Sequence, residues 1–270
     1  MARKSAENVQ VALKQAQDLI YEAWEASTAK RRIALAEKAL ALSSLCADAY
    51  VVLAQDAEPG SDKEFDLWRR GVAAGTKALG EVVFAECVGQ FWGILDTRPY
   101  MRARCGLVRA LWARGARSEA IDHLRDMLRL NSNDNQGARY ILAALLVEAG
   151  RDHDLAILLN DYPDDGAAAW SWTAALLAFR RTGDSKESGT LLTQALADNG
   201  DVPGYLFGER PLPKLLPAYF SPGDEDEAIH YVVDFRTGWV NTPGAIDWLR
   251  VHAPAPKTVK RRLPGRSRLQ

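Results

Sequence analysis

Three glycines recur at a nearly constant spacing in the middle of the sequence, and this period constrains the fold more than any other feature. Gly115, Gly150 and Gly183 are separated by 35 and 33 residues, and each follows an apolar stretch with helical periodicity. A glycine between two helices supplies the left-handed or otherwise tight backbone that lets the chain reverse. One helix pair cannot bury its apolar face without neighbours, so a fixed period indicates stacked units. The spacing therefore predicts a row of antiparallel helix pairs.

Large and small residues flank these glycines at the positions that close helix packing needs. In the unit near residue 101, Leu107 and Leu111 fill large positions and Ala120 fills a small one. In the unit near residue 169, the matching positions hold Trp172, Ala175, Leu176, Phe179, Leu192 and Ala195. This pattern resembles the tetratricopeptide repeat, whose period is about 34 residues. The resemblance implies an all-α fold, a right-handed superhelix of antiparallel helix pairs.

Changes in composition divide the chain into three parts. We predict a repeat solenoid over residues 1–203, with an insertion near 84–100. Residues 204–254 begin with a proline-rich stretch, whose aromatic side chains we expect to pack on the last repeat, and continue into a C-terminal capping helix pair. Residues 255–270 contain six Lys or Arg and no acid, which is typical of a flexible basic tail.

Three motifs fall outside the general repeat pattern. They are FWGILDTRPYMRAR, LNSNDNQGARY and WVNTPGAIDWL. Together they are similar to bacterial tetratricopeptide proteins related to the family called suppressor of tumorigenicity, and the resemblance covers most of residues 30–250. That family implies an interaction scaffold and offers no catalytic residue to transfer, so we expect a protein that is not an enzyme.

Charge and cysteine usage indicate a cytoplasmic protein without a uniform surface field. Lys and Arg total 34 against 35 Asp and Glu, so any electrostatic recognition must be local. Cys46, Cys87 and Cys105 are odd in number and lie in apolar helical stretches, which suggests buried, reduced thiols. The N-terminal residues do not resemble an export signal, and charged residues interrupt every apolar run that could span a membrane.

The sequence shows no pattern that predicts a metal, a cofactor or a catalytic triad. His123, His153, His230 and His252 lie too far apart along the chain for metal-site spacing. The stretch GVAAGTKALG lacks the Gly-Lys-Ser/Thr ending of a phosphate loop, and a small-residue helix face explains it better. We therefore expect no cofactor.

A row of arginine and aromatic residues falls on the first helices of the predicted pairs, on the face toward a concave groove. The predicted partner-binding residues are Arg102, Arg109, Trp112, Arg139, Tyr140, Trp170, Thr173 and Arg180. Arginine forks bind carboxylates and aromatic planes supply contact area, so this groove favours a protein or peptide partner, acidic in its chemistry. The alternative is a solvated face whose arginines pair with nearby acids.

These features support two hypotheses of function. The first is a protein-protein interaction adaptor or scaffold that holds a partner segment in the groove. The alternative is a nucleic-acid-associated repeat protein that uses the basic tail and the same arginines, and this hypothesis predicts salt-sensitive binding.

Overall fold

The protein is built from α-helices joined by short connections. A computed structural model describes the backbone of residues 2–253 and the side chains from residue 7 onward. The predicted basic tail at 255–270 lies outside the described residues. Two compact units divide the chain, residues 1–145 and residues 146–270. The predicted boundary near residue 203 lies inside the second unit, and the division into a solenoid and a cap stays a prediction.

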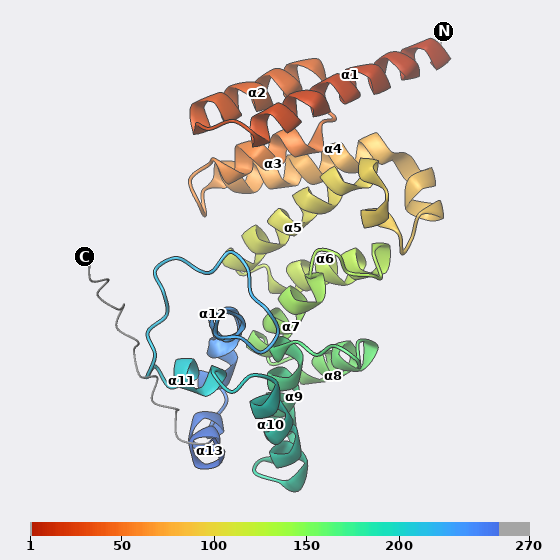
Figure 1. Cartoon of the computed structure of the whole chain (residues 1–270). Coiled ribbons are helices and arrows are strands. Elements are labelled where there is room, and N and C mark those ends of the chain that lie inside the picture. The colour runs from red at the N-terminus through yellow and green to blue at the C-terminus, as the bar shows by residue number, and fades with distance from the viewer. Residues whose placement is uncertain (1, 254–270) are drawn as a thin grey trace, which may run out of the picture. The chain divides into compact units, whose positions relative to one another are not determined.

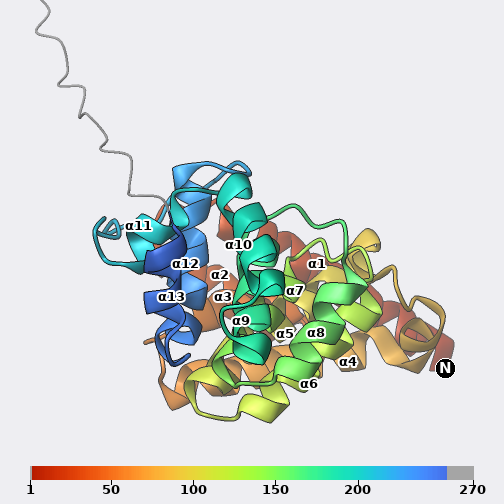
Figure 2. The ribbon, with the colours of Figure 1, turned by 90° about the horizontal axis from the view of Figure 1, so that it is seen from below.

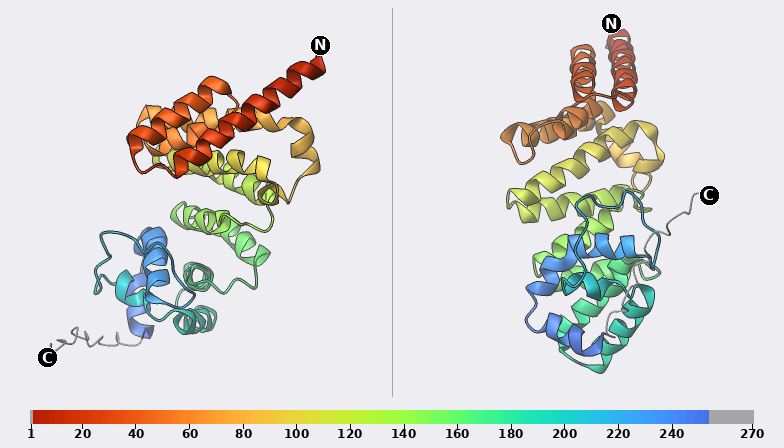
Figure 3. Two further views of the ribbon diagram at one scale, coloured as in Figure 1. Left: turned by 45° about the horizontal axis from the view of Figure 1, so that its top comes forward. Right: turned by 60° about the vertical axis from the view of Figure 1, so that its left-hand side comes forward.

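The first unit contains three successive helix pairs (Figure 1). Its elements are α1 (Ala2–Trp24), α2 (Ala29–Leu42), α3 (Ala47–Gln55), α4 (Asp62–Glu86), the short 3-10 turns η1 (Phe91–Gly93) and η2 (Leu95–Thr97), α5 (Arg98–Ala113), α6 (Arg117–Leu130) and the start of α7 (Ala138–Glu148). Each pair packs internally, and α3 also contacts α1 and α5. Helices α1 and α2 lie side by side in Figures 1 and 3.

The second unit combines helix pairs with a C-terminal group of short helices. It holds the end of α7, then α8 (Asp152–Asp161), α9 (Ala168–Thr182), α10 (Lys186–Asp198), α11 (Val202–Leu206), α12 (Glu225–Val240) and α13 (Ala245–His252). Helix α9 contacts α8, α10, α12 and α13, and α11 contacts both α12 and α13. Figure 2 shows α11, α12 and α13 grouped beside the α9–α10 pair. The predicted C-terminal helix pair is therefore present and packs on α9, the first helix of the last repeat pair.

The all-α fold of repeated helix pairs is confirmed, because the residues that the structure describes contain helices and turns and no strand. The glycines that revealed the period also behave as predicted. Gly115, Gly150 and Gly183 have φ angles of 79°, 65° and 64°, in the left-handed region that glycine adopts without a steric penalty. The right-handed winding of the pairs stays a prediction.

Small residues bring neighbouring helices of the first unit into close contact. A Cβ atom on Gly71 would lie 3.1 Å from the Cβ of Ala103 and 3.2 Å from that of Tyr50, on α5 and α3. A Cβ on Gly106 would lie 2.3 Å from ring carbons of Trp68. The small-residue face predicted in GVAAGTKALG is therefore confirmed, since glycine is what lets α4 approach its neighbours.

Aromatic side chains form the interior of the second unit. Trp172 and Trp239 are fully buried with ring centroids 6.0 Å apart, and Trp239 Nε1 donates a 2.8 Å hydrogen bond to the Tyr231 hydroxyl. Trp172 Nε1 donates to the backbone carbonyl of Asn199 at 3.2 Å. Each indole N–H thus has an acceptor, which offsets the cost of burying it.

Candidate protein-binding surfaces

The first unit contains a cavity of about 690 Å³ between α1, the start of α3, the second half of α4 and the beginning of α5. Apolar side chains that include Leu13, Leu79, Val83 and Pro99 form much of its wall. Helix α4 lines this wall on both sides of Gly80, whose φ of 71° interrupts the helical backbone. Size and lining suit several apolar side chains of a partner segment.

A buried carboxylate next to the lining residue Ala47 binds Arg102. Asp48 is fully buried at the start of α3, and Arg102 binds both of its oxygens, with Nε 2.8 Å from Oδ1. Gln17, which lines the cavity, donates a third hydrogen bond to Asp48 at 2.9 Å. The Arg102 guanidinium also lies over the Trp24 ring, 5.0 Å from its centroid. The charge of Arg102 is therefore neutralised within the fold.

Helix α5, whose residues Pro99 and Tyr100 line the cavity, carries a row of side chains on one face, which we call the α5 stripe. Its members are Arg98, Arg102, Cys105, Arg109 and Trp112, which recur three and four residues apart. Arg109 is exposed, and Arg98 donates to the Trp92 carbonyl at 2.9 Å while lying over its ring. Neither Arg98 nor Arg109 forms an ion pair with a carboxylate in the part of the chain that the structure describes.

Burial raises the pKa of the Cys105 thiol, although the neighbouring Arg109 guanidinium acts in the opposite direction. Burial likewise raises the pKa of Cys46 to about 11. Both thiols are therefore protonated near neutral pH and are weak nucleophiles. All three cysteines are unpaired, as predicted, but only Cys46 is buried, whereas Cys87 and Cys105 are partly exposed.

A buried arginine, which the sequence did not single out, holds α5 against α6. Arg104 donates to His123 Nδ1 at 2.9 Å and to the Tyr100 hydroxyl at 2.8 Å, and it pairs with Asp126. Tyr100 lines the cavity, so this network supports one of its walls. Burial first, and then the positive charge of Arg104, lower the pKa of His123. No sequence motif signalled this arrangement, because it joins residues of two helices that only packing brings together.

Arg139 stabilises the start of α7. Asp134, in the left-handed region at φ 46°, accepts hydrogen bonds from the backbone N–H groups of Ala138 and Arg139 at 2.6 and 3.0 Å. The Arg139 side chain pairs with the same carboxylate at 3.2 Å and also donates to the Tyr140 hydroxyl at 2.8 Å. Burial raises the pKa of Asp134, and the hydrogen bonds from α7 oppose that effect. Arg139 and Tyr140 therefore have a local structural role.

In the second unit, Arg180 connects four segments through its guanidinium. Its Nε donates to the Thr242 hydroxyl at 2.8 Å, and its two Nη groups bind the Val147 carbonyl, each at 3.1 Å. They also bind Asp152 at 2.9 Å and the Gly238 carbonyl at 3.2 Å. The side chain borders a cavity of about 510 Å³. Because its donors already have acceptors, Arg180 fixes the helices around that cavity.

Two of the predicted groove residues lie in the interior of the second unit. Thr173 is 0% exposed and Trp170 is 5% exposed. Their predicted placement on an accessible face is therefore wrong, because α12 packs on α9 and the Tyr162 ring lies against Trp170. Helical periodicity alone marks which residues share a face and does not say which face a later helix covers.

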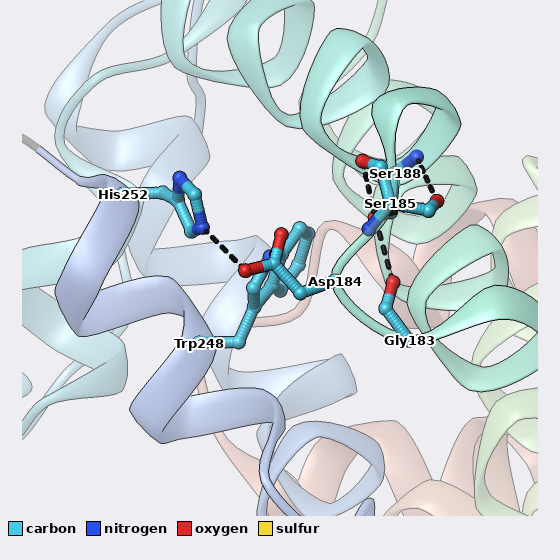
Figure 4. Close-up of polar contacts among 6 residues, drawn as sticks. All are labelled: Gly183, Asp184, Ser185, Ser188, Trp248 and His252. Carbon is cyan, nitrogen blue, oxygen red and sulfur yellow. Dashed lines mark hydrogen bonds and ion pairs between the residues drawn. The ribbon is translucent and has the colours of Figure 1, made fainter.

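The turn between α9 and α10 holds the last helix in place (Figure 4). Asp184 accepts hydrogen bonds from Trp248 Nε1 at 3.1 Å and from His252 Nε2 at 3.1 Å. Its pKa is lowered, first by the contact with His252. Ser185 and Ser188 exchange hydrogen bonds in a capping box that starts α10. His252 therefore has a structural role, because its contact with Asp184 holds α13 against this turn.

The described residues contain no group of three or more His, Cys, Asp or Glu side chains placed to hold a metal ion. Among the helices of residues 2–253, none has the length and apolar character needed to cross a membrane.

Comparisons with known proteins support the resemblance drawn from the sequence. No protein-family model matches the chain. The Protein ST7 homolog of Caenorhabditis elegans is 26% identical over 274 residues, which cover 87% of this chain and 50% of that protein. The chain thus spans about half the length of the curated relative it matches, and the predicted likeness to the suppressor of tumorigenicity family is confirmed. The crystal structure of YrrB, described as a TPR protein with an unusual peptide-binding site, aligns with a TM-score of 0.49 and 18% identity, over 72% of this chain and 88% of that one.

Proposed function

We propose that the protein is an interaction adaptor that binds a partner peptide or protein through its first unit. The observation that carries this proposal is the juxtaposition of an apolar cavity of about 690 Å³ with the α5 stripe. Arg109 lies three turns along α5 from the cavity wall at Pro99, a rise of about 15 Å. A segment that places apolar side chains in the cavity and an acidic group near Arg109 would use both features.

The contacts of the predicted binding residues divide them into three groups: residues for partner contact, residues that position the site, and residues of the interior. Arg109 and Trp112 are the ones we assign to partner contact, and Arg98 joins them as a residue that sequence reasoning missed. Arg102 and Arg139 position the site, because each neutralises a buried carboxylate. Thr173, Trp170 and Arg180 belong to the interior and bracing of the second unit, and the proposal does not use them.

An adaptor role also fits the absence of a reactive arrangement around the cavity. The buried carboxylate of Asp48, next to the lining residue Ala47, is bound by Arg102 and Gln17. The described part of the chain offers no metal-type cluster there. The nucleic-acid alternative uses the basic tail at 255–270, which lies outside the described residues, and the same arginines. Among those arginines, Arg102, Arg139 and Arg180 already pair with carboxylates.

The test is selection of peptides by the whole chain from a displayed random library, followed by fluorescence anisotropy with the peptide enriched most. We expect enriched peptides to combine large apolar residues with Asp or Glu. Arg109→Glu should weaken binding by about tenfold, or ~1.4 kcal/mol, because attraction becomes repulsion. The control is Arg31→Glu, an equally exposed arginine on α2, which should bind like the unmodified protein. No enrichment, or equal binding by the Arg109→Glu variant, would refute the proposal.

A further inference from the structure

The connection between α11 and α12 exposes an unusual concentration of apolar side chains. Residues 211–220, which we call the apolar segment, have no helix and present five large apolar side chains to solvent, namely Leu212, Leu215, Leu216, Tyr219 and Phe220. Leu215 is 87% exposed and Tyr219 is 88% exposed. The prediction that aromatics of this stretch pack on the last repeat is therefore wrong for Tyr219. Contiguous exposed apolar residues of this kind mark interaction sites.

Polar contacts hold the apolar segment at both ends. Before it, Arg210 binds Asp201 at 2.8 Å. Near its end, His230 Nε2 lies 2.9 Å from the Pro217 carbonyl oxygen, and the Phe220 ring is 5.1 Å from the His230 ring. These contacts fix the backbone on either side of Leu215. The segment therefore displays its apolar side chains at a reduced entropic cost of binding.

Three prolines determine how the apolar segment can be recognised. Pro211, Pro213 and Pro217 have no backbone N–H and hold φ near −65°. Pairing with a strand of a sheet would lack these donors, and the structure shows no strand among residues 2–253 to offer an edge. A partner must therefore receive the segment as an extended chain whose side chains enter apolar pockets.

The first unit carries a receptor of matching chemistry. Its cavity is apolar inside, and its rim includes the exposed apolar side chains Val11 and Leu95. The charged residues that line the same cavity are Asp18, Asp96 and Lys14, with a net charge of −1, whereas the apolar segment carries a single charge, the cation Lys214. Apolar surface and charge are thus complementary. A lipid surface fits less well, because the acidic run from Asp224 to Glu227 begins four residues after the end of the segment and would be repelled by anionic headgroups.

We infer that the apolar segment of one copy of the protein docks into the first-unit cavity of a second copy. This inference rests on the proposed function, because it names one occupant of the same cavity. Two copies that exchange segments make the contact twice, which closes the assembly as a dimer. Binding of a partner peptide in the cavity then competes with self-association.

The experiment is sedimentation velocity on the full chain over a hundredfold range of protein concentration. We expect a monomer-dimer equilibrium whose dissociation constant rises roughly tenfold or more in a Leu215→Asp/Tyr219→Asp variant. Val251→Asp is the matched control, since Val251 is also a highly exposed apolar residue of the second unit and should leave the equilibrium unchanged. All three positions are exposed, so the substitutions should not alter the unfolding midpoint.

Mixing two variants tests whether the apolar segment binds in the first-unit cavity. A Val11→Asp/Leu95→Asp variant keeps the apolar segment but changes the cavity rim, and it should also be monomeric. When it is mixed with the Leu215→Asp/Tyr219→Asp variant, one intact segment meets one intact cavity, and a mixed dimer should form. A wild-type chain that stays monomeric, segment variants that still dimerise, or a mixture without dimer would each overturn the inference. Selected peptides that still bind such a monomer would leave the proposed function standing.

Discussion

Arg180 in the second unit and Arg109 in the first unit have opposite roles, although both lie on the first helix of a helix pair. In the second unit, Arg180 on α9 has its donors bound to backbone carbonyls, a hydroxyl and a carboxylate. In the first unit, Arg109 on α5 is exposed and has no carboxylate partner among the described residues. The same residue type is thus structural where further helices cover it and available where none does.

The units also differ in how their helices meet. Glycines on α4 and α5 let the helices of the first unit approach closely around a cavity, whereas Trp172 and Trp239 fill the centre of the second unit. Close approach through small residues leaves little tolerance for added volume. We therefore expect substitutions in the two units to change the stability of the protein in different ways.

Removing the Arg180 side chain should have the largest effect on stability. Arg180→Ala leaves the Val147 and Gly238 carbonyls and Asp152 without their donor, so we expect a loss of roughly 3 to 5 kcal/mol in the free energy of unfolding. The neighbouring exposed residue supplies the control, Arg181→Ala, with a change near zero. Urea unfolding followed by tryptophan fluorescence measures both, and equal midpoints would show that Arg180 is not a structural hub.

Adding one methyl group should affect the two units in opposite directions. Gly106→Ala places a Cβ 2.3 Å from the Trp68 ring, and we expect a destabilisation of about 1 to 3 kcal/mol from overpacking. Gly189 on α10 has open space around it, so Gly189→Ala should stabilise the protein by up to about 1 kcal/mol through helix propensity. Thermal unfolding of the two variants tests this difference, and two shifts of the same sign would contradict it.

Acidification should weaken the first unit through His123. Because burial and Arg104 lower its pKa below the ordinary value of about 6.5, the unfolded chain binds the proton more readily. The stabilising contribution is complete above that value and is lost as pH falls toward the lowered pKa. Glu119 and Asp126 act in the opposite direction and limit the effect.

His123→Asn retains an acceptor for Arg104 but does not titrate, so it should remove this part of the pH dependence. The measurement is the change in unfolding midpoint between neutral and mildly acidic pH, compared between the unmodified protein and the His123→Asn variant. An identical pH dependence in the variant would assign the effect to other groups.

Local features were predictable from the sequence because they depend on backbone chemistry. The period of Gly115, Gly150 and Gly183 identified the helix pairs, and their positive φ angles arise from the freedom of glycine alone. The start of α12 is equally local, since Asp224 caps this helix through its own side chain. These signals act within a few residues and need no knowledge of the neighbours.

The roles of individual side chains were decided by the tertiary structure. Thr173 and Arg109 were both assigned to one groove, yet α12 covers the first and leaves the second exposed. Arg180 was read as a groove residue, but its acceptors come from residues up to 62 positions away. The sequence by itself determined the helix pairs and their order, because periodicity and turn chemistry are local. Burial and ion pairing depend on which surfaces meet, so only the packed structure decided which arginines remain available.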